Sequence, residues 1–187
     1  AGLEYGHNQF DVDRYEQLRK ISIDILENHT GFERDKIKDF FASGEGYPTP
    51  KVDIRAAVFQ DEKILMVKEK MDGCWSLPGG WADQDLTIKE NLVKESLEEA
   101  GAKIKPLKIL AIYDRKLHNY PPIPYGCYKI FVHCEFLDGE FTKNTETSDA
   151  NFSRLDNLPE LSAERNTLDQ IKTCFHQKEI PNSIPFD

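Results

Sequence analysis

The segment from Leu77 to Ala102, LPGGWADQDLTIKENLVKESLEEAGA, constrains the fold more than any other part of the chain. Its residues predict a glycine-rich turn, then a short polar loop, then a helix. Thr87 and Glu90 stand at the spacing of a capping box, so the helix is expected to begin just after Thr87. Gly101 is a residue type that commonly ends a helix, and the helix should stop there.

The predicted helix has an acidic side and an apolar side. At about 3.6 residues per turn, the two faces are formed by Glu95, Glu98 and Glu99 and by Val93, Leu97 and Ala100. We expect the apolar face to dock on a sheet, which leaves the three carboxylates converging on the loop before the helix. Carboxylates this close repel one another unless cations lie among them. The pattern therefore favours magnesium or manganese, because hard divalent ions prefer carboxylate, water and phosphate oxygens.

The same segment resembles the signature of the Nudix hydrolases, G-x5-E-x7-R-E-U-x-E-E-x-G-U, in which U is aliphatic. The matching fixed positions are Gly80, Glu95, Glu98, Glu99 and Gly101, with Ala102 in the last aliphatic position. A match of this length, in the context of a turn followed by a helix, is specific.

Three positions depart from the signature. Leu86 stands where the family has its first glutamate, Lys94 where it has arginine, and Ser96 where it has an aliphatic residue. Asp83 and Asp85 lie nearby but out of register. In the family, the glutamate and arginine mainly brace the loop, so these departures concern loop rigidity and turnover more than metal binding.

The resemblance extends to a Nudix branch that carries a helical N-terminal domain and includes bacterial CDP-choline and ADP-ribose pyrophosphatases. The segments that carry it are AGLEYGHNQFDVDRYEQLRKIS, GYPTPKVDIRAAVF, KEKMDGCWSLPGGWAD and AIYDRKLHNYPP. It implies metal-dependent hydrolysis of the pyrophosphate bond in a nucleoside diphosphate linked to another group, CDP-choline-like or ADP-ribose-like. It also implies an α+β fold, the Nudix α/β/α sandwich with a mixed sheet, after a small helical domain. Members usually begin further upstream, so residues before Ala1 are expected to be missing or removed.

The resemblance also implies roles for the acidic residues. Glu95 and Glu99 are expected to be the principal metal ligands, together with the backbone carbonyl of Gly80. Glu98 would be a further ligand or would act on the attacking water. Many Nudix enzymes place a general base on a later loop, where Glu146 is our candidate and Asp149 the second choice. An ordinary polar surface loop is the alternative interpretation of both.

Three residues are expected to contact the substrate. Arg55 lies in a predicted strand that should line the site, and its guanidinium fork suits a phosphate. Arg115 and Tyr120, like His118, fall in a proline-rich loop after a strand. An aromatic such as Tyr113, Tyr120 or Tyr125 could stack on a base, although aromatic residues chiefly fill cores.

Charge and composition exclude several classes of protein. The net charge of −9 argues against strong nucleic-acid binding, which requires clusters of lysine and arginine. The sequence has no apolar span long enough for a membrane helix and no secretion signal before Ala1. The four cysteines lack the paired spacing of zinc sites, so we expect reduced thiols in a cytoplasmic protein.

The chain is expected to divide into an N-terminal helical domain, residues 1–47, and a Nudix domain, residues 48–187. In the first domain the predicted apolar faces consist of Tyr15, Leu18, Ser22 and Ile25 and of Ile37, Phe40 and Phe41. The composition from Gly44 to Pro50 predicts a linker. Because two such helices bury little by themselves, they should pack against the second domain or another protomer. We expect a homodimer.

The second domain is expected to be built mainly from strands. Residues 52–59 and 64–68 predict a hairpin, and residues 107–113 and 128–136 predict two further strands. A last helix should begin near Ser162, with Leu168, Ile171 and Phe175 facing inward.

Two other functions remain open. Leu86 and Lys94 would suit a degenerate Nudix domain that binds a nucleotide or sugar nucleotide as a sensor without efficient turnover. The acidic helix could also be only a protein-interaction surface, in which case divalent ions should have no effect on the protein.

Overall fold

A computed structural model describes residues 8–30, 33–35, 37, 49–123, 125–181 and 183–187. The chain divides into two compact units, Ala1–Thr49 and Pro50–Asp187. The predicted positions of Phe40 and Phe41, and the linker from Gly44 to Pro48, lie outside the described residues.

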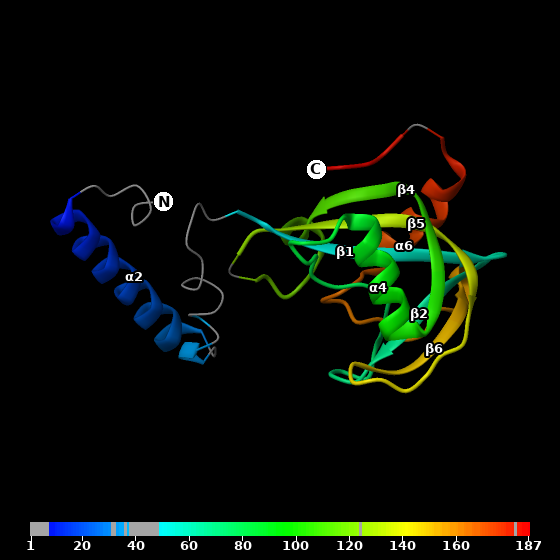
Figure 1. The fold of residues 1–187 in the computed structure, drawn as a ribbon, viewed down its shortest axis with the longest axis horizontal. Helices are drawn as coiled ribbons and strands as arrows, with labels where there is room; N and C mark the ends of the chain where they lie inside the picture. The colour runs from blue at the N-terminus through cyan, green and yellow to red at the C-terminus, as the bar shows by residue number, and fades with distance from the viewer. Residues whose placement is uncertain (1–7, 31–32, 36, 38–48, 124, 182) are drawn as a thin grey trace. The chain divides into compact units, whose positions relative to one another are not determined.

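The first unit contains the long helix α2, Gln9–His29 (Figure 1). Asn8 caps it by accepting a hydrogen bond from the Phe10 N–H. Within this unit Ile23 and Ile37 are buried. The predicted face with Tyr15, Leu18 and Ile25 is exposed, so its apolar side chains are available for a partner.

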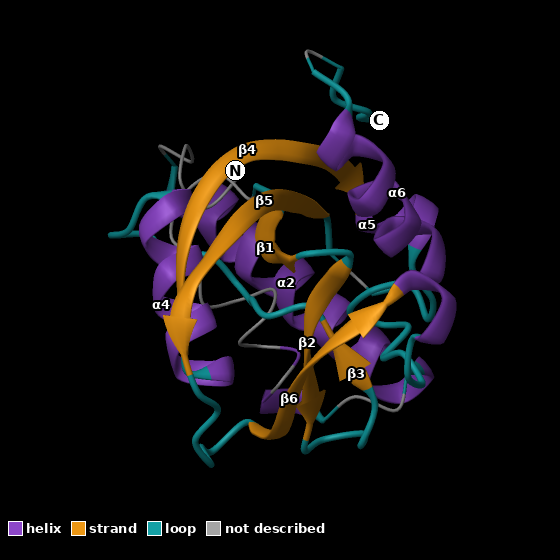
Figure 2. Ribbon diagram, turned by 90° about the vertical axis from the view of Figure 1, so that its right-hand side faces the viewer, coloured by secondary structure: helices purple, strands orange, loops and turns teal. Residues whose placement is uncertain are grey.

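The second unit is built on a mixed sheet. Its strands are β1 (Lys51–Gln60), β2 (Lys63–Glu69), β3 (Trp75–Ser76), β4 (Ala102–Asp114), β5 (Cys127–Gly139) and β6 (Thr147–Arg154). The order is β3-β2-β1-β5-β4, with β6 paired to the other edge of β2. β1 and β5 run parallel, and the other pairs are antiparallel. β1 and β2 pair beside their turn, where Phe59 lies opposite Ile64, and the sheet then opens into two groups of strands (Figure 2).

Helices α4 (Ile88–Ala100) and α6 (Leu168–Glu179) each cover a hydrophobic cluster of this sheet. Alternate residues of β1 point to opposite faces, so one strand serves both clusters. Ile54 and Val58 pack with Leu92 of α4, whereas Ala57 and Phe59 pack with Ile171 of α6. The predicted α/β/α sandwich with a mixed sheet is confirmed. The remaining short elements are α5 (Arg115–His118) and η1 (Leu155–Asn157).

The predicted apolar face of α4 is wrong. Val93 is 39% exposed and Leu97 is 51% exposed, although Ala100 is buried as expected. The buried side consists of Asn91, Leu92, Ser96, Glu99 and Ala100. The helix is rotated so that Leu92 and several small or polar residues face the sheet. Glu99 therefore lies on the buried side of the helix.

The predicted start of the last helix is also wrong. α6 begins at Leu168, because Thr167 and Gln170 form a capping box there. Ser162 instead donates its N–H to the carbonyl of Trp75 and its hydroxyl to Asp72. Leu168, predicted to face inward, is 45% exposed, whereas Ile171 is buried and Phe175 packs against the core as predicted.

The strands differ from prediction mainly in length. β4 and β5 extend beyond the predicted ranges, because their antiparallel pairing continues from Ala102 opposite Gly139 to Asp114 opposite Tyr128. β6 was missed because its sequence, TSDANFSR, is polar. It pairs along β2 as an edge strand, where polar residues are common. No helix among the described residues is long and apolar enough to cross a membrane.

Candidate active site

The glycine turn runs beside β1 and brings the loop to α4. Pro78 and Gly80 accept hydrogen bonds through their carbonyls from the N–H groups of Ala56 and Ile54. Gly79 has φ 133°, and a Cβ there would lie 2.1 Å from the Ile54 carbonyl oxygen. Only glycine fits this close approach of two backbones.

Glu99 is held against this turn. Its Oε2 accepts the Gly79 N–H at 2.8 Å, and the residue is 3% exposed. Burial is the main cause that raises the pKa of Glu99 to about 7; the charges of Glu69 and Glu95 act in the same direction, whereas Arg55 and the Gly79 N–H oppose the shift. Glu99 is therefore a desolvated carboxylate held against the glycine turn.

The neighbouring carboxylates add to this negative charge. Burial raises the pKa of Glu95, with contributions from Glu98 and Glu146, while Lys94 opposes the shift. Glu95 lies beside Gly80, because a Cβ on that glycine would be 3.6 Å from Glu95 Oε2. Glu95, Glu99 and Gly80 thus occur on one side of the loop–helix junction.

The carboxylates are not gathered into a closed cage. Among the residues that the structure describes, no group of three or more His, Cys, Asp or Glu side chains is arranged to hold a metal ion. Glu98 is 60% exposed, whereas Glu95 is 14% exposed, so the carboxylates of the predicted acidic face differ in their surroundings. The donor set nevertheless suits a hard divalent ion, because carboxylate and carbonyl oxygens are the ligands that such ions prefer.

The two candidates for general base lie in different settings. Glu146 is exposed in the loop before β6, near enough to Glu95 to influence its pKa. Asp149 lies within β6, opposite Lys68, and not in the predicted loop.

Sequence reasoning missed Asn91, which is fully buried. Its side-chain amide donates to the backbone carbonyls of Asp83, Leu86 and Thr87, at 3.4, 3.2 and 3.2 Å. Its side-chain oxygen accepts the Asp83 N–H at 3.0 Å. One side chain therefore ties both ends of the loop to α4. Its position just after a predicted capping box was the available signal, because side chains in a first helical turn can bond to the preceding loop.

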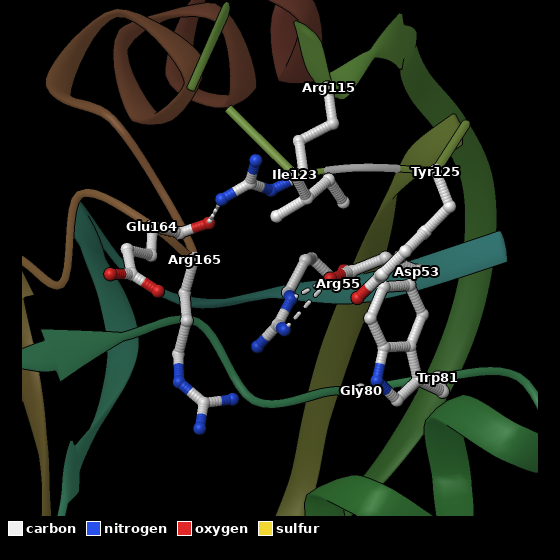
Figure 3. Close-up of a pocket in the computed structure, with 9 residues that line it drawn as sticks. All are labelled: Asp53, Arg55, Gly80, Trp81, Arg115, Ile123, Tyr125, Glu164 and Arg165. Carbon is white, nitrogen blue, oxygen red and sulfur yellow. Dashed lines mark hydrogen bonds and ion pairs between the residues drawn. The ribbon is translucent and has the colours of Figure 1, made fainter. Parts of the chain in front are cut away.

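A pocket of about 170 Å³ opens beside Gly80 (Figure 3). Its lining residues are Asp53, Arg55, Gly80, Trp81, Arg115, Ile123, Tyr125, Glu164 and Arg165. The predicted Arg55 and Arg115 thus lie together. Tyr120 is 78% exposed and is not among the lining residues, and His118 pairs with Asp187. Arg115 belongs to the short helix α5, not to a loop as predicted.

The floor of the pocket holds a buried ionic cluster. Asp53 accepts two hydrogen bonds from Arg55, at 2.7 and 3.1 Å, and one from Lys129 at 2.9 Å. Burial alone would raise the pKa of Asp53, but the charges of Arg55 and Lys129 hold it below its usual value. Burial, reinforced by Arg55, lowers the pKa of Lys129 to about 8 although Asp53 opposes the shift. One carboxylate therefore serves two cations.

Two further arginines add to the pocket. Arg115 is buried and donates to the backbone carbonyls of Pro121 and Glu164, at 2.9 and 3.5 Å. Both acceptors are neutral carbonyl groups. Arg165 lies 3.1 Å from the buried carboxylate of Glu69. On the opposite side of the pocket the rings of Trp81 and Tyr125 stand 6.0 Å apart (Figure 3). The pocket thus combines positive charge with an aromatic side, an arrangement that suits phosphate and a planar ring.

Comparison with known families agrees with this arrangement. Residues 49–173 match the NUDIX domain, and residues 1–41 match the UDP-X-like, N-terminal oligomerisation domain. The chain belongs to the Nudix hydrolase family and is a Nudix enzyme.

Several relatives are similar over most of the chain. The chain is 42% identical to YjhB of Bacillus subtilis (strain 168), a proposed ADP-ribose pyrophosphatase, over 94% of this chain and 84% of the relative. A crystal structure of an ADP-ribose pyrophosphatase from Streptococcus suis is 43% identical, with a TM-score of 0.69, over 74% of this chain and 100% of that chain. A crystal structure of UDP-X diphosphatase is 31% identical, with a TM-score of 0.69, over 100% of this chain and 91% of that chain.

Proposed function

We propose that this protein hydrolyses the pyrophosphate bond of a nucleoside diphosphate linked to another group, with magnesium or manganese as cofactor. The observation that carries the proposal is the position of Gly80, which both lines the cationic pocket and abuts Glu95 of α4. Positive charge for a diphosphate and carboxylates for a divalent ion therefore meet at one residue. The ADP-ribose pyrophosphatase and UDP-X diphosphatase relatives support the same class of substrate.

The residues divide the chemistry between them. Glu95, Glu99 and the Gly80 carbonyl would hold the metal, with Glu98 at the exposed edge of the set. When bound, the metal supplies charge neutralisation of the pyrophosphate and a lowered pKa of the attacking water. Arg55 and Arg115 would orient the phosphates from the pocket side. Glu146, exposed near Glu95, is the proposed base that takes the proton of the attacking water.

The ring of the nucleoside would contact Trp81 and Tyr125, which form the aromatic side of the pocket. Tyr120, which is 78% exposed and outside the lining of the pocket, remains a proposed contact with the substrate. The pocket is consistent with ADP-ribose-like, CDP-choline-like and UDP-linked substrates, because rings of any base can stack on an aromatic face.

A substrate panel tests this proposal. ADP-ribose, CDP-choline and a UDP-sugar are each incubated with the protein and with magnesium, manganese or a chelator. We expect release of AMP, CMP or UMP from at least one substrate, only when a divalent ion is present. Tight binding of a panel member without hydrolysis would instead support the sensor function. The absence of any divalent effect would support a protein-interaction role.

We also propose that the protein is a homodimer assembled through the N-terminal unit. Residues 1–41 match a model described as an oligomerisation domain. In α2 the exposed apolar side chains include Leu18, Ile21 and Ile25, at helical spacing on one side. A second copy of this helix would bury that stripe.

A further inference from the structure

The loop from Trp81 to Thr87 carries the chain from the glycine turn to α4, so its conformation decides where the carboxylates of α4 lie relative to Gly80. In the Nudix signature a glutamate and an arginine brace this loop, but here those positions hold Leu86 and Lys94. Leu86 has no charge to offer Lys94. If this loop is braced against α4, the contact must therefore involve residues other than Leu86.

Lys94 forms an ion pair with a different residue of the loop. Its Nζ lies 2.9 Å from Asp83 Oδ2, three residues before the position that the signature assigns to glutamate. The same Nζ lies 3.9 Å from Glu95 Oε1 and 3.9 Å from Glu98 Oε2. One ammonium thus connects the loop to two carboxylates of the acidic face.

Asn91 fixes the backbone of Asp83 from the buried side. The loop is therefore held twice at the same residue, once through its backbone and once through its carboxylate. Both groups of the ion pair are substantially exposed, with side-chain exposures of 40% for Lys94 and 54% for Asp83. An exposed pair contributes little to the free energy of unfolding, so its effect should be one of geometry.

We propose that the Asp83–Lys94 pair, anchored by Asn91, is the relocated brace of this Nudix loop and positions Glu95 and Glu98. Asp83 and Lys94 are positioning residues that act through the carboxylates. The inference rests on the proposed function for its catalytic consequence, but the brace itself is a property of the metal-free protein.

The first experiment needs no metal. Hydrogen exchange is followed at the backbone amides of residues 82–87 in wild type, Asp83→Asn, Lys94→Gln and Lys94→Arg. We expect Asp83→Asn and Lys94→Gln to speed exchange in the loop by about three- to tenfold, with little change in melting temperature. Lys94→Arg keeps the pair and should retain the wild-type rate. Asp85→Asn is the matched control, since it removes a carboxylate of the same loop for which the described residues show no ion pair.

The second experiment measures kcat, KM and the divalent concentration that gives half of the maximal thermal shift. We expect about tenfold lower kcat and weaker divalent binding in Asp83→Asn and Lys94→Gln, because small displacements of catalytic groups are costly. KM should change little. The double variant should be no worse than either single variant, because both remove one interaction.

The outcomes separate the inference from the proposed function. If Asp83→Asn and Lys94→Gln match Asp85→Asn in exchange, kcat and divalent binding, the relocated brace is wrong while the hydrolase function stands. If wild type hydrolyses no panel member and shows no divalent shift, the proposed function fails. In that case the hydrogen-exchange rates alone test the brace. Unchanged rates in Asp83→Asn and Lys94→Gln would overturn it, whereas rates that rise in these two variants but not in Asp85→Asn would support it.

Discussion

Glu99 shows how one side chain connects the turn to the chemistry. It caps the Gly79 N–H, is almost fully buried and has a raised pKa. Those features would be a cost in a purely structural residue, because a buried carboxylate without a matching cation is unfavourable. They fit the role of metal ligand that is proposed for Glu99.

We therefore predict opposite effects of Glu99→Gln on stability and on turnover. Glutamine keeps an oxygen for the Gly79 N–H and removes the buried charge, so metal-free thermal stability should be unchanged or higher. The divalent-induced stabilisation should be weakened, and kcat should fall by at least about a hundredfold. Melting curves with and without magnesium, together with kinetics, measure all three. Full turnover in this variant would remove Glu99 from the proposed ligands.

The ionic cluster at the floor of the pocket leads to a second prediction at the residue scale, because Asp53 pairs with two cations. Asp53→Asn removes the carboxylate that pairs with both Arg55 and Lys129 in the buried cluster and should lower the free energy of unfolding by about 3–5 kcal/mol. Lys129→Met leaves the Asp53–Arg55 pair intact and should cost clearly less. Urea unfolding of both variants tests the difference. Equal losses would show that Asp53 does not hold both cations.

Lys129 also predicts a dependence of stability on pH. Its pKa is about 8 in the folded protein and about 10.4 in an unfolded chain, so between these values the unfolded state binds more protons. Stability of wild type relative to Lys129→Met should therefore rise as the pH increases from about 8 to about 10. Unfolding curves of the two proteins across that range provide the measurement. A difference independent of pH would contradict the lowered pKa.

At the scale of elements, both ends of α4 are set by local sequence. Thr87 and Glu90 form the predicted capping box, and Gly101 ends the helix in the left-handed region, at φ 64°. Gly101 does more than end a helix, because a Cβ there would lie 2.1 Å from the Glu140 carbonyl oxygen. The helix end is thereby packed against the chain that follows β5.

Gly101→Ala should thus cost more than the usual loss for a left-handed residue. We expect a decrease of about 2–3 kcal/mol in the free energy of unfolding, from the positive φ and the backbone clash together. Gly73→Ala is the matched control, because Gly73 also has positive φ, at 73°, but has nothing within 4 Å of the added Cβ. Denaturant unfolding of both variants separates the two effects. An equal decrease in the free energy of unfolding for both variants would show that the close contact with Glu140 does not contribute to the effect.

At the scale of the whole molecule, the exposed stripe of α2 requires a partner in the proposed dimer. Leu18→Glu combined with Ile21→Glu places two charges in the stripe, and we expect the mass measured by light scattering to fall to that of a monomer. Lys20→Glu, on the same helix, is the control and should remain dimeric. Deletion through Tyr47 should likewise give a monomer, with loss of solubility or substrate affinity. A monomeric wild type would overturn the proposal.

The site could be predicted in part from sequence because much of its chemistry is local. The helix ends, the glycine turn and the register of Glu95, Glu98 and Glu99 depend on residues a few positions apart. Arg55 was predicted because it lies in a strand expected to line the site and its guanidinium fork suits a phosphate. The wrong face of α4 arose where tertiary packing overrode local periodicity, as Val93 shows. The start of α6 was misplaced because the local capping box of Thr167 and Gln170 was overlooked.

By itself, the sequence determined the turn, the helix that follows it and the acidic residues on that helix, because capping and helical spacing need no distant partner. Only the tertiary structure decided which cationic side chain pairs with which carboxylate. The parallel register of β1 and β5 places Asp53 opposite Lys129, 76 residues away. The folded loop likewise brings Asp83 to Lys94 in place of the expected partner. Such pairs depend on strand register and loop path, and these are fixed only when the whole domain packs.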